Sequence, residues 1–291
     1  MTKFIQLLIS GLSLGSIYGL IALGFVLVYK ATRVFNFAQG DLMMVGAFAL
    51  VLFDHSLGLP TWLAVVLALA SAAAVGVAFQ YVFVRPLAGQ DFLPIVMATI
   101  GASLIIEAIV QIGFGVQDIT YQTSLPSNVW TIGGVHIASL DVITIGIAAF
   151  CLTVFTLFFR FTDIGLQMRG AAENGEAAAL SGVNVRRVTV VAWIVGTLLA
   201  FIGGLVLANT TQVVNVPLAG LGLLAFPAVV IGGLESVPGA VLGGVVVGVL
   251  QDLGAGYISI DAQTPLVYAA LLIMLLIRPY GLFGEKEIRR V

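Results

Sequence analysis

FIQLLISGLSLGSIYGLIALGFVLVY, residues 4–29, is a run without any charged side chain near the amino end of the chain. A transmembrane helix needs about 20 consecutive apolar residues to cross the hydrocarbon core of a bilayer. The run meets that length, and it is too long for the apolar region of a secretory signal peptide. It therefore predicts a membrane-spanning helix that is retained in the protein.

The composition extends this prediction to the whole chain. Of the 291 residues, 60% are hydrophobic and only 9% are charged, and the mean hydropathy is +1.14. A water-soluble domain would lack the polar residues to cover its surface. We expect an all-α fold, a polytopic transmembrane bundle of about eight or nine membrane segments, some of them short or broken. Residues 1–291 are expected to form a single domain.

Candidate membrane segments fall into two groups by length. Five runs meet or approach the length of a full span: 4–29, 61–84, 92–116, 142–159 and 188–208. Four others are shorter or interrupted by Gly and Pro: 38–53, 219–234, 237–251 and 265–278. The second group predicts helices that are tilted, broken or re-entrant, and residues 219–251 are compatible with either two crossings or a re-entrant hairpin.

Basic residues are segregated among the linkers. They occur in linkers 30–33, 85, 160–187 and 278–290, whereas linkers 54–60, 117–141, 209–218 and 252–264 contain no Lys or Arg. The positive-inside rule places the basic linkers in the cytoplasm. Because Lys30, Arg33 and Arg85 must share a side while 61–84 crosses once, the weak segment 38–53 must cross too. The amino terminus is then outside, and the carboxyl terminus is cytoplasmic.

Two linkers have the composition of ordered structure. The outer linker 117–141 shows a short β-like alternation between turn formers, which predicts a small cap on the membrane face. In the cytoplasmic loop 160–187, Asn174 is suited to cap a helix that begins near Gly175, and Gly182 is suited to end it. We expect one short helix there.

This loop resembles a known docking motif. Glu176, Ala177 and Ala178, followed by Gly182, resemble the EAA loop of ABC importer permeases, which docks into a separate ATPase. The stretches NFAQGDLMMVGAF (36–48), IGGLESVPGAVLGG (231–244) and RPYGLFG (278–284) are similar to the membrane subunits of branched-chain amino acid ABC importers. The resemblance covers nearly the whole chain, and it is to the shorter of the two permeases that pair in such systems.

The resemblance implies a set of partners and a coupling site. The expected partners are a second homologous permease in a heterodimer, two ATPase subunits that carry ATP-Mg, an extracytoplasmic solute-binding protein and the lipid of a bacterial inner membrane. No nucleic acid is expected. The residues implied to couple to the ATPase are Glu173, Glu176, Ala177, Ala178 and Gly182.

The chain itself lacks the motifs of an enzyme. None of Lys3, Lys30 and Lys286 has the glycines that a phosphate-binding loop requires, so nucleotide chemistry is expected in another chain. His55 and His136 have no second ligand nearby in sequence, so we expect no metal site and no cofactor bound by this chain. No nucleophile–base constellation emerges, and no catalytic residue is expected.

Four polar residues are candidates for the solute pathway. Asn36, Gln39 and Asp41 lie at the start of the short segment 38–53, where they are suited either to cap the helix or to line a conduit. Glu107 lies deep in an apolar run, so its carboxylate must face protein, water or a partner. It is compatible with a pathway contact or with a structural acid between helices.

We therefore expect a permease subunit of an ABC importer for branched-chain or other hydrophobic amino acids, forming half of the conduit. A permease of the same type for urea, short amides or aromatic acids is the first alternative. A gradient-driven secondary carrier and a passive channel are alternatives of a different class.

Overall fold

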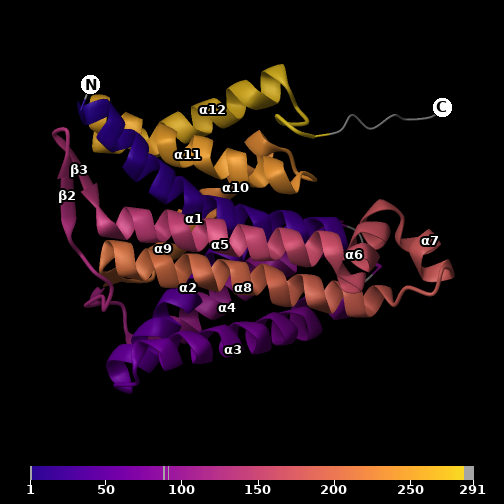
Figure 1. Ribbon diagram of the computed structural model, residues 1–291. Coiled ribbons are helices and arrows are strands. Elements are labelled where there is room, and N and C mark those ends of the chain that lie inside the picture. Colours follow the sequence, from indigo (N-terminus) through magenta and orange to yellow (C-terminus); the bar gives the residue numbers. More distant parts are fainter. Residues whose placement is uncertain (1, 88, 91, 285–291) are drawn as a thin grey trace.

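The structure is a bundle of helices packed side by side (Figure 1). The computed structural model describes residues 2–87, 89–90 and 92–284. Seven helices in the described part of the chain are long and apolar enough to cross a membrane: Thr2–Thr32, Thr61–Leu87, Phe92–Phe114, Ser139–Phe161, Val185–Thr211, Val237–Tyr257 and Ile260–Ile277. Together with the shorter helical segments Gln39–Leu50 and Leu218–Gly232, they confirm the predicted all-α membrane bundle.

The elements follow one another along the chain as helices with short connections. The α-helices are α1 (Thr2–Thr32), α2 (Gln39–Leu50), α3 (Thr61–Phe79), α4 (Phe92–Phe114), α5 (Ser139–Phe161), α6 (Asp163–Glu173), α7 (Gly175–Leu180), α8 (Val185–Thr211), α9 (Leu218–Leu223), α10 (Ala225–Gly232), α11 (Val237–Tyr257) and α12 (Gln263–Ile277). Four short helical turns, Val51–Ser56, Gln80–Val84, Arg85–Leu87 and Ile260–Ala262, extend or precede them, and four strands complete the fold: β1 (Ile119–Thr120), β2 (Val129–Ile132), β3 (Val135–Ala138) and β4 (Val213–Val214).

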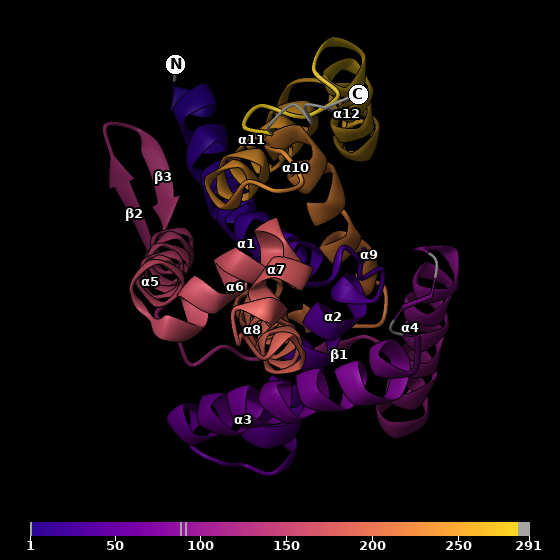
Figure 2. The ribbon, with the colours of Figure 1, turned by 90° about the vertical axis from the view of Figure 1, so that its right-hand side faces the viewer.

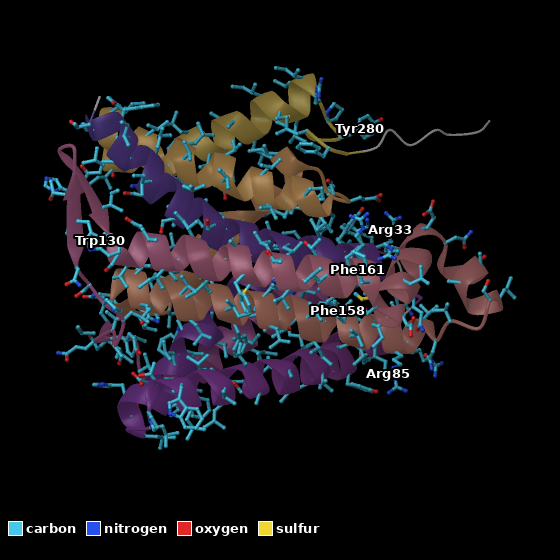
Figure 3. All side chains as sticks on the ribbon, viewed as in Figure 1. Arg33, Arg85, Trp130, Phe158, Phe161 and Tyr280 are labelled. Atoms are coloured by element: carbon cyan, nitrogen blue, oxygen red, sulfur yellow. The ribbon has the colours of Figure 1, made fainter. Side chains whose placement is uncertain are left out.

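The two ends of the bundle differ in chemistry. Arg33 and Arg85 lie at the end where α6 and α7 project, and Trp130 lies at the opposite end in the β2–β3 hairpin (Figure 3). The hairpin is antiparallel with Trp130 opposite Ile137, as the alternation in linker 117–141 predicts. The segregation of basic linkers therefore appears as a basic end and a hairpin end. Of the basic linker 278–290, residues 285–290 lie outside the described part.

The segment 218–232 runs from one end of the bundle to the other. At its start, Val213 and Val214 pair with Thr120 and Ile119 near the hairpin end. At its finish, Glu235 forms an ion pair with Arg33 at the basic end. The helix breaks at Leu224 into α9 and α10, and α11 then returns to the hairpin end. Residues 219–251 thus make two passes through the bundle.

Two of the segments predicted to be short are longer in the structure. The helix that begins at Gln39 continues as a π-helical turn through Ser56, beyond the predicted end at residue 53. Similarly, α11 continues through Asp252 to Tyr257, beyond the predicted end at residue 251. In both cases polar residues that have the composition of a linker carry on the helix, because a helix remains regular after it leaves the apolar layer.

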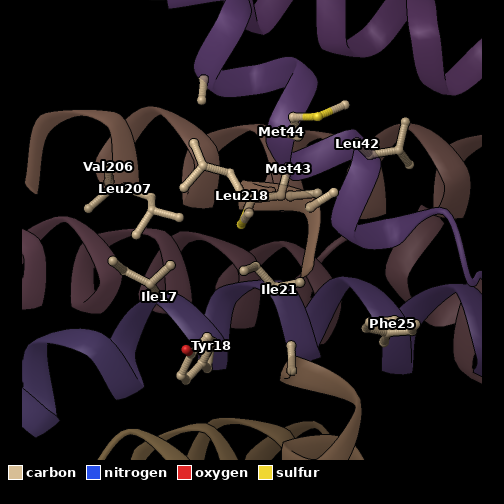
Figure 4. Packing of buried hydrophobic residues seen from close by; sticks show 14 of the residues in the cluster. Ile17, Tyr18, Ile21, Phe25, Leu42, Met43, Met44, Val206, Leu207 and Leu218 are labelled. Carbon is tan, nitrogen blue, oxygen red and sulfur yellow. The ribbon is translucent and has the colours of Figure 1, made fainter. Parts of the chain in front are cut away.

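Helix α1 lies at the centre of the bundle, among α5, α8, α10 and α11 (Figure 2). Its residues from Ile17 to Val28 are almost all buried. Ile17 and Ile21 join Met43 of α2 and Leu218 of α9 in one apolar cluster (Figure 4). The helix that is predicted from the first apolar run is therefore covered mainly by protein rather than by lipid.

Glycine allows α11 to approach α1 at backbone distance. A Cβ on Gly248 would fall on the backbone of Gly15, and a Cβ on Gly244 would fall on the backbone of Gly19. Small residues at such positions let two membrane helices pack closely. The contact between α1 and α11 is thus one of backbone against backbone.

Polar side chains hold the beginning of the outer linker 117–141 against the turn that precedes α3. The Tyr121 hydroxyl donates a hydrogen bond to Asp54 Oδ2 at 2.7 Å, and Thr61 Oγ1 donates to Asp54 Oδ1 at 2.9 Å. Burial and, after it, the Asp54 carboxylate raise the pKa of Tyr121. The phenol therefore stays protonated and keeps donating to Asp54 across the physiological range.

Candidate functional site

The loop at the basic end folds into two short helices rather than the single helix predicted. The side chain of Thr162 accepts a hydrogen bond from Gly165 N at the start of α6, and Asn174 Oδ1 accepts one from Ala177 N at 2.9 Å at the start of α7. The backbone of Asn174 is extended, with φ −152° and ψ 99°, and this extended residue separates α6 from α7. Residues 171–173 therefore belong to α6, which begins at Asp163.

Helix α7 ends as the sequence predicts, at a glycine. Gly182 has φ +86°, a left-handed conformation that glycine adopts without steric strain. The chain turns there and enters α8, where Asn184 Oδ1 accepts a hydrogen bond from Arg187 N at 3.1 Å. Asn174 and Gly182 therefore define the two ends of α7, and Asn184 defines the start of α8.

The surface that α7 presents combines an acid, a small residue and an exposed leucine. Glu173, Glu176 and Ala177 are exposed, whereas Ala178 is buried against the loop. Leu180 is 91% exposed, the highest value among the large hydrophobic side chains that the structure describes. Its side chain is therefore accessible for contact with another protein.

Arg33 connects this loop to the rest of the bundle. Its guanidinium pairs with Glu235, donates to the carbonyl oxygen of Ala172 at 3.1 Å and lies over the ring of Tyr29. Its backbone has φ +57°, which is unfavourable for a residue with a side chain. One residue therefore joins the end of α1, the end of α6 and the turn between α10 and α11.

Between Arg33 and α2 the chain passes through the bundle without helical structure. Asn36 Nδ2 donates to Gln39 Oε1 at 3.0 Å, and Gln39 Nε2 donates to the Gly196 carbonyl of α8 at 3.2 Å. Asn36 Oδ1 also accepts from Ala38 N at 3.2 Å. Both side chains are almost fully buried. The helix start predicted to lie at depth is therefore held by protein groups, with Asn36 bonding one of the free backbone donors.

Asp41 faces the opposite direction, towards α4. The backbone N of Phe37 donates to Thr99 Oγ1 at 3.3 Å, and the rings of Phe48 and Phe114 lie 4.9 Å apart, so α2 runs alongside α4. Between these contacts, Asp41 faces Ser103 and Glu107. Asp41 is 3% exposed, and its Oδ1 has no hydrogen-bond partner among the described residues.

The four predicted pathway residues thus form two groups on either side of α2. Asn36 bonds to Gln39, which bonds to α8, whereas Asp41 of α2 lies near enough to the half-buried Glu107 of α4 for the two carboxylates to repel each other. Neither α2 nor α4 contains a Lys or Arg that could balance these carboxylates. Among the described residues, no group of three His, Cys, Asp or Glu comes together to hold a metal ion.

Comparison with known protein families shows the family of this chain. A family model described as "Branched-chain amino acid transport system / permease component" matches residues 7–277, from within α1 to the end of α12. The chain belongs to this permease family. The resemblance found in the motifs of the sequence is thereby confirmed, and the permease is a multi-pass membrane component of a transport system rather than an enzyme.

Individual relatives match the permease over its full length. It is 31% identical to the high-affinity branched-chain amino acid transport system permease protein LivH of Escherichia coli strain K12, over 99% of this chain and 98% of that protein. It is 30% identical to BraD of Pseudomonas aeruginosa, which carries the same description, over 99% and 98%. Among solved structures, PsaBC from Streptococcus pneumoniae in complex with Fab covers 97% of this chain with 13% identity and a TM-score of 0.51, which shows a shared fold.

Sequence reasoning missed two residues of this permease. Leu180 follows Glu176 by one helical turn, and its position on an exposed helix could have been inferred from that spacing. Arg33 has no such signal. It counts as one more basic residue of an inner linker until the fold brings Ala172 and Glu235 to it.

Proposed function

We propose that the permease forms half of the conduit of an ABC importer for branched-chain amino acids in the bacterial inner membrane. The observation that carries this proposal is the capped helix α7, which holds Glu176 and Leu180 exposed beyond the basic end of the bundle. A projecting helix with an apolar anchor and a neighbouring acid suits docking into a groove of a motor subunit. The basic end then faces the cytoplasm, and the amino terminus faces outward.

The proposed complex contains four further subunits. A second homologous permease completes the conduit in a heterodimer, and two ATPase subunits bind ATP-Mg and receive α7 of this chain and its counterpart. A solute-binding protein delivers the amino acid at the hairpin end. Glu173, Glu176, Ala177, Ala178 and Gly182 are the proposed coupling residues of this chain.

Arg33 is proposed to transmit movement from α7 into the bundle. When the ATPases close on ATP, they move α6 and α7, and the bond from Arg33 to Ala172 carries that displacement to the end of α1. The ion pair with Glu235 carries it to the turn between α10 and α11. The non-helical residues 34–38 follow directly, so the start of α2 changes its position relative to the conduit.

Replacing Arg33 with glycine is expected to lower uptake about tenfold while ATP hydrolysis continues. Glycine fits the backbone at φ +57° but removes every contact of the guanidinium. Arg33 and Glu235 are 53% and 47% exposed, so their pair adds only about 0–1 kcal/mol to stability. Leucine uptake and ATPase activity are measured together in proteoliposomes.

The matched control for that variant is Arg278→Ala, which removes an exposed arginine at the same end. It should leave uptake and hydrolysis coupled. Normal coupling in Arg33→Gly would show that movement reaches the bundle by another route.

Asp41 and Glu107 are the proposed contacts of the solute on this half of the conduit. A branched-chain amino acid carries an ammonium group, and a carboxylate without a partner in an apolar region favours such a cation. The surrounding apolar helices suit its side chain. Urea and short amides carry no charge for these carboxylates to bind, so they fit the pair less well.

The Asp41→Asn variant is expected to reduce uptake at least tenfold, because a hydrogen bond to a charged group contributes about 1.5–3 kcal/mol. Its thermal stability should stay equal or rise, because the change removes a buried charge that has no partner at Oδ1. Uptake of labelled leucine and thermal unfolding in detergent measure the two effects. Asp261→Asn, in an exposed turn, is the control. Unchanged uptake in Asp41→Asn would remove this residue from the pathway.

Reconstitution separates the ABC importer from the alternative classes. Proteoliposomes containing both permeases, the ATPases and the binding protein should take up leucine only with ATP. Uptake driven by a proton or sodium gradient without ATPases would identify a secondary carrier. Equilibration without any driving force would identify a channel. Competition by valine and isoleucine, against urea and aromatic acids, tests the solute class.

A further inference from the structure

A second feature of the basic end is a cavity that the proposed transport cycle does not use. It has a volume of about 960 Å³ and lies where the end of α1 and the turns after α3 meet the starts of α4 and α8. It is separate from the cleft around Arg33, which lies beside α5 and α6.

The rim of this cavity is basic. Among its described lining residues are Arg85, Arg186 and Arg187, and no carboxylate. All three arginines are exposed, and none makes an ion pair within the described part of the chain. The cleft around Arg33 differs, because the carboxylates of Glu173 and Glu235 lie among its four basic residues. The described rim of the first cavity therefore offers an anion three arginines with no carboxylate among them.

The most buried part of the cavity wall is apolar. Val34, Val84 and Ile95 are buried and contribute hydrocarbon surface, with the half-buried Val190 beside them. Gln80 also lines the cavity, but its Oε1 is itself closed off from solvent, so the cavity does not present this oxygen to a ligand. The cavity therefore suits a ligand that carries an anion next to apolar groups.

The position of the cavity favours a lipid over a soluble ligand. Arg85 follows the apolar helix α3, and Arg186 and Arg187 begin the apolar helix α8, so the rim lies where membrane-length helices end. That level corresponds to the phospholipid headgroups, and the apolar wall extends towards the acyl chains. Basic pockets between helices at the cytoplasmic surface are suited to anionic headgroups.

We propose that the cavity binds one anionic phospholipid, such as phosphatidylglycerol. The arginines bind its phosphate, and the valine and isoleucine side chains contact its upper acyl chains. A soluble phosphate compound shares the phosphate chemistry but has no use for the apolar wall.

The test is native mass spectrometry of the full-length permease in detergent, titrated with phosphatidylglycerol or phosphatidylcholine. The wild type is expected to bind one phosphatidylglycerol in preference to phosphatidylcholine. The double variant Arg186→Ala/Arg187→Ala should bind it about thirtyfold more weakly, because each basic residue near an anionic headgroup contributes about a factor of five.

Two control variants separate charge at the site from charge at this end of the protein. Arg160→Ala/Arg278→Ala removes two exposed arginines outside the cavity and should leave lipid binding unchanged. Arg186→Lys/Arg187→Lys keeps the charge and should retain most of the binding.

Three results would overturn the proposal. The first is equal retention of phosphatidylglycerol by the wild type and the Arg186→Ala/Arg187→Ala variant. The second is complete displacement by excess inorganic phosphate, which would assign the site to a soluble anion. The third is loss of ATPase binding in the same variant with lipid binding intact, which would place these arginines in the docking surface.

Discussion

A single aspartate in place of Leu180 is expected to weaken ATPase binding about thirtyfold or more and to abolish most ATP-driven uptake. Leu180 is 91% exposed, so in the isolated permease its side chain gains nothing from burial. Burying a leucine in a partner's pocket contributes about 1.5–3 kcal/mol, and a carboxylate in the same pocket is unfavourable. Truncation of a residue that acts as an interface hot spot costs about 2 kcal/mol or more.

Folding should be unaffected by this change, because substitutions on an exposed surface usually alter stability by less than about 0.5 kcal/mol. The dissociation constant for purified ATPase and the uptake of leucine are the two measurements. Leu180→Met is the matched control, since methionine keeps the apolar character and nearly the same volume. ATPase that binds Leu180→Asp as tightly as the wild type would exclude α7 as the docking element.

A cysteine at the same position tests which side of the membrane α7 faces. Cys151 is the single native cysteine, so Cys151→Ala/Leu180→Cys carries one thiol. A membrane-impermeant reagent should label it only from the cytoplasmic side. Labelling from outside would reverse the proposed orientation and with it the docking role.

Leucine in place of Gly248 is expected to prevent stable assembly of the bundle. The first side-chain atom would already overlap the backbone of Gly15, and a backbone cannot rotate away as a flexible side chain can. Overpacking costs about 1–3 kcal/mol where side chains adjust and more where they cannot. We therefore expect a loss of stability above about 3 kcal/mol, measured as the yield of monodisperse protein and as thermal unfolding in detergent.

The control is the same substitution at Gly146, in the middle of α5. A Cβ there meets nothing within 4 Å, so leucine should be tolerated. If Gly248→Leu purifies and unfolds like Gly146→Leu, α1 and α11 do not pack at backbone distance in the membrane.

Much of the fold follows from two properties of the sequence. The lengths of the apolar runs predict most of the spans, and the positions of Lys and Arg predict which linkers share an end. The prediction that 38–53 crosses the membrane rests on charge alone, and in the structure that helix continues to Ser56. The sequence predicts the ends of α2 and α11 too early, because Asp54 and Asp252 are typical of linkers although the helix continues past them.

The candidate site is less accessible to sequence reasoning, for a physical reason. The caps at Asn174 and Gly182 act over a few residues, so their positions can be inferred locally. The proximity of Asp41 to Glu107 and the three contacts of Arg33 involve residues far apart in the chain. Hydropathy cannot predict which faces of two apolar helices meet, because both faces are apolar.

The central position of α1 has a consequence for biosynthesis. The ribosome makes α1 first, but its closest neighbours, α8 and α11, are made late. During translation the glycine-lined side of α1 must therefore wait in lipid until more than half of the chain has been inserted. A nascent chain that stalls before Val237 leaves this surface uncovered, and such incomplete membrane proteins are candidates for quality-control proteolysis.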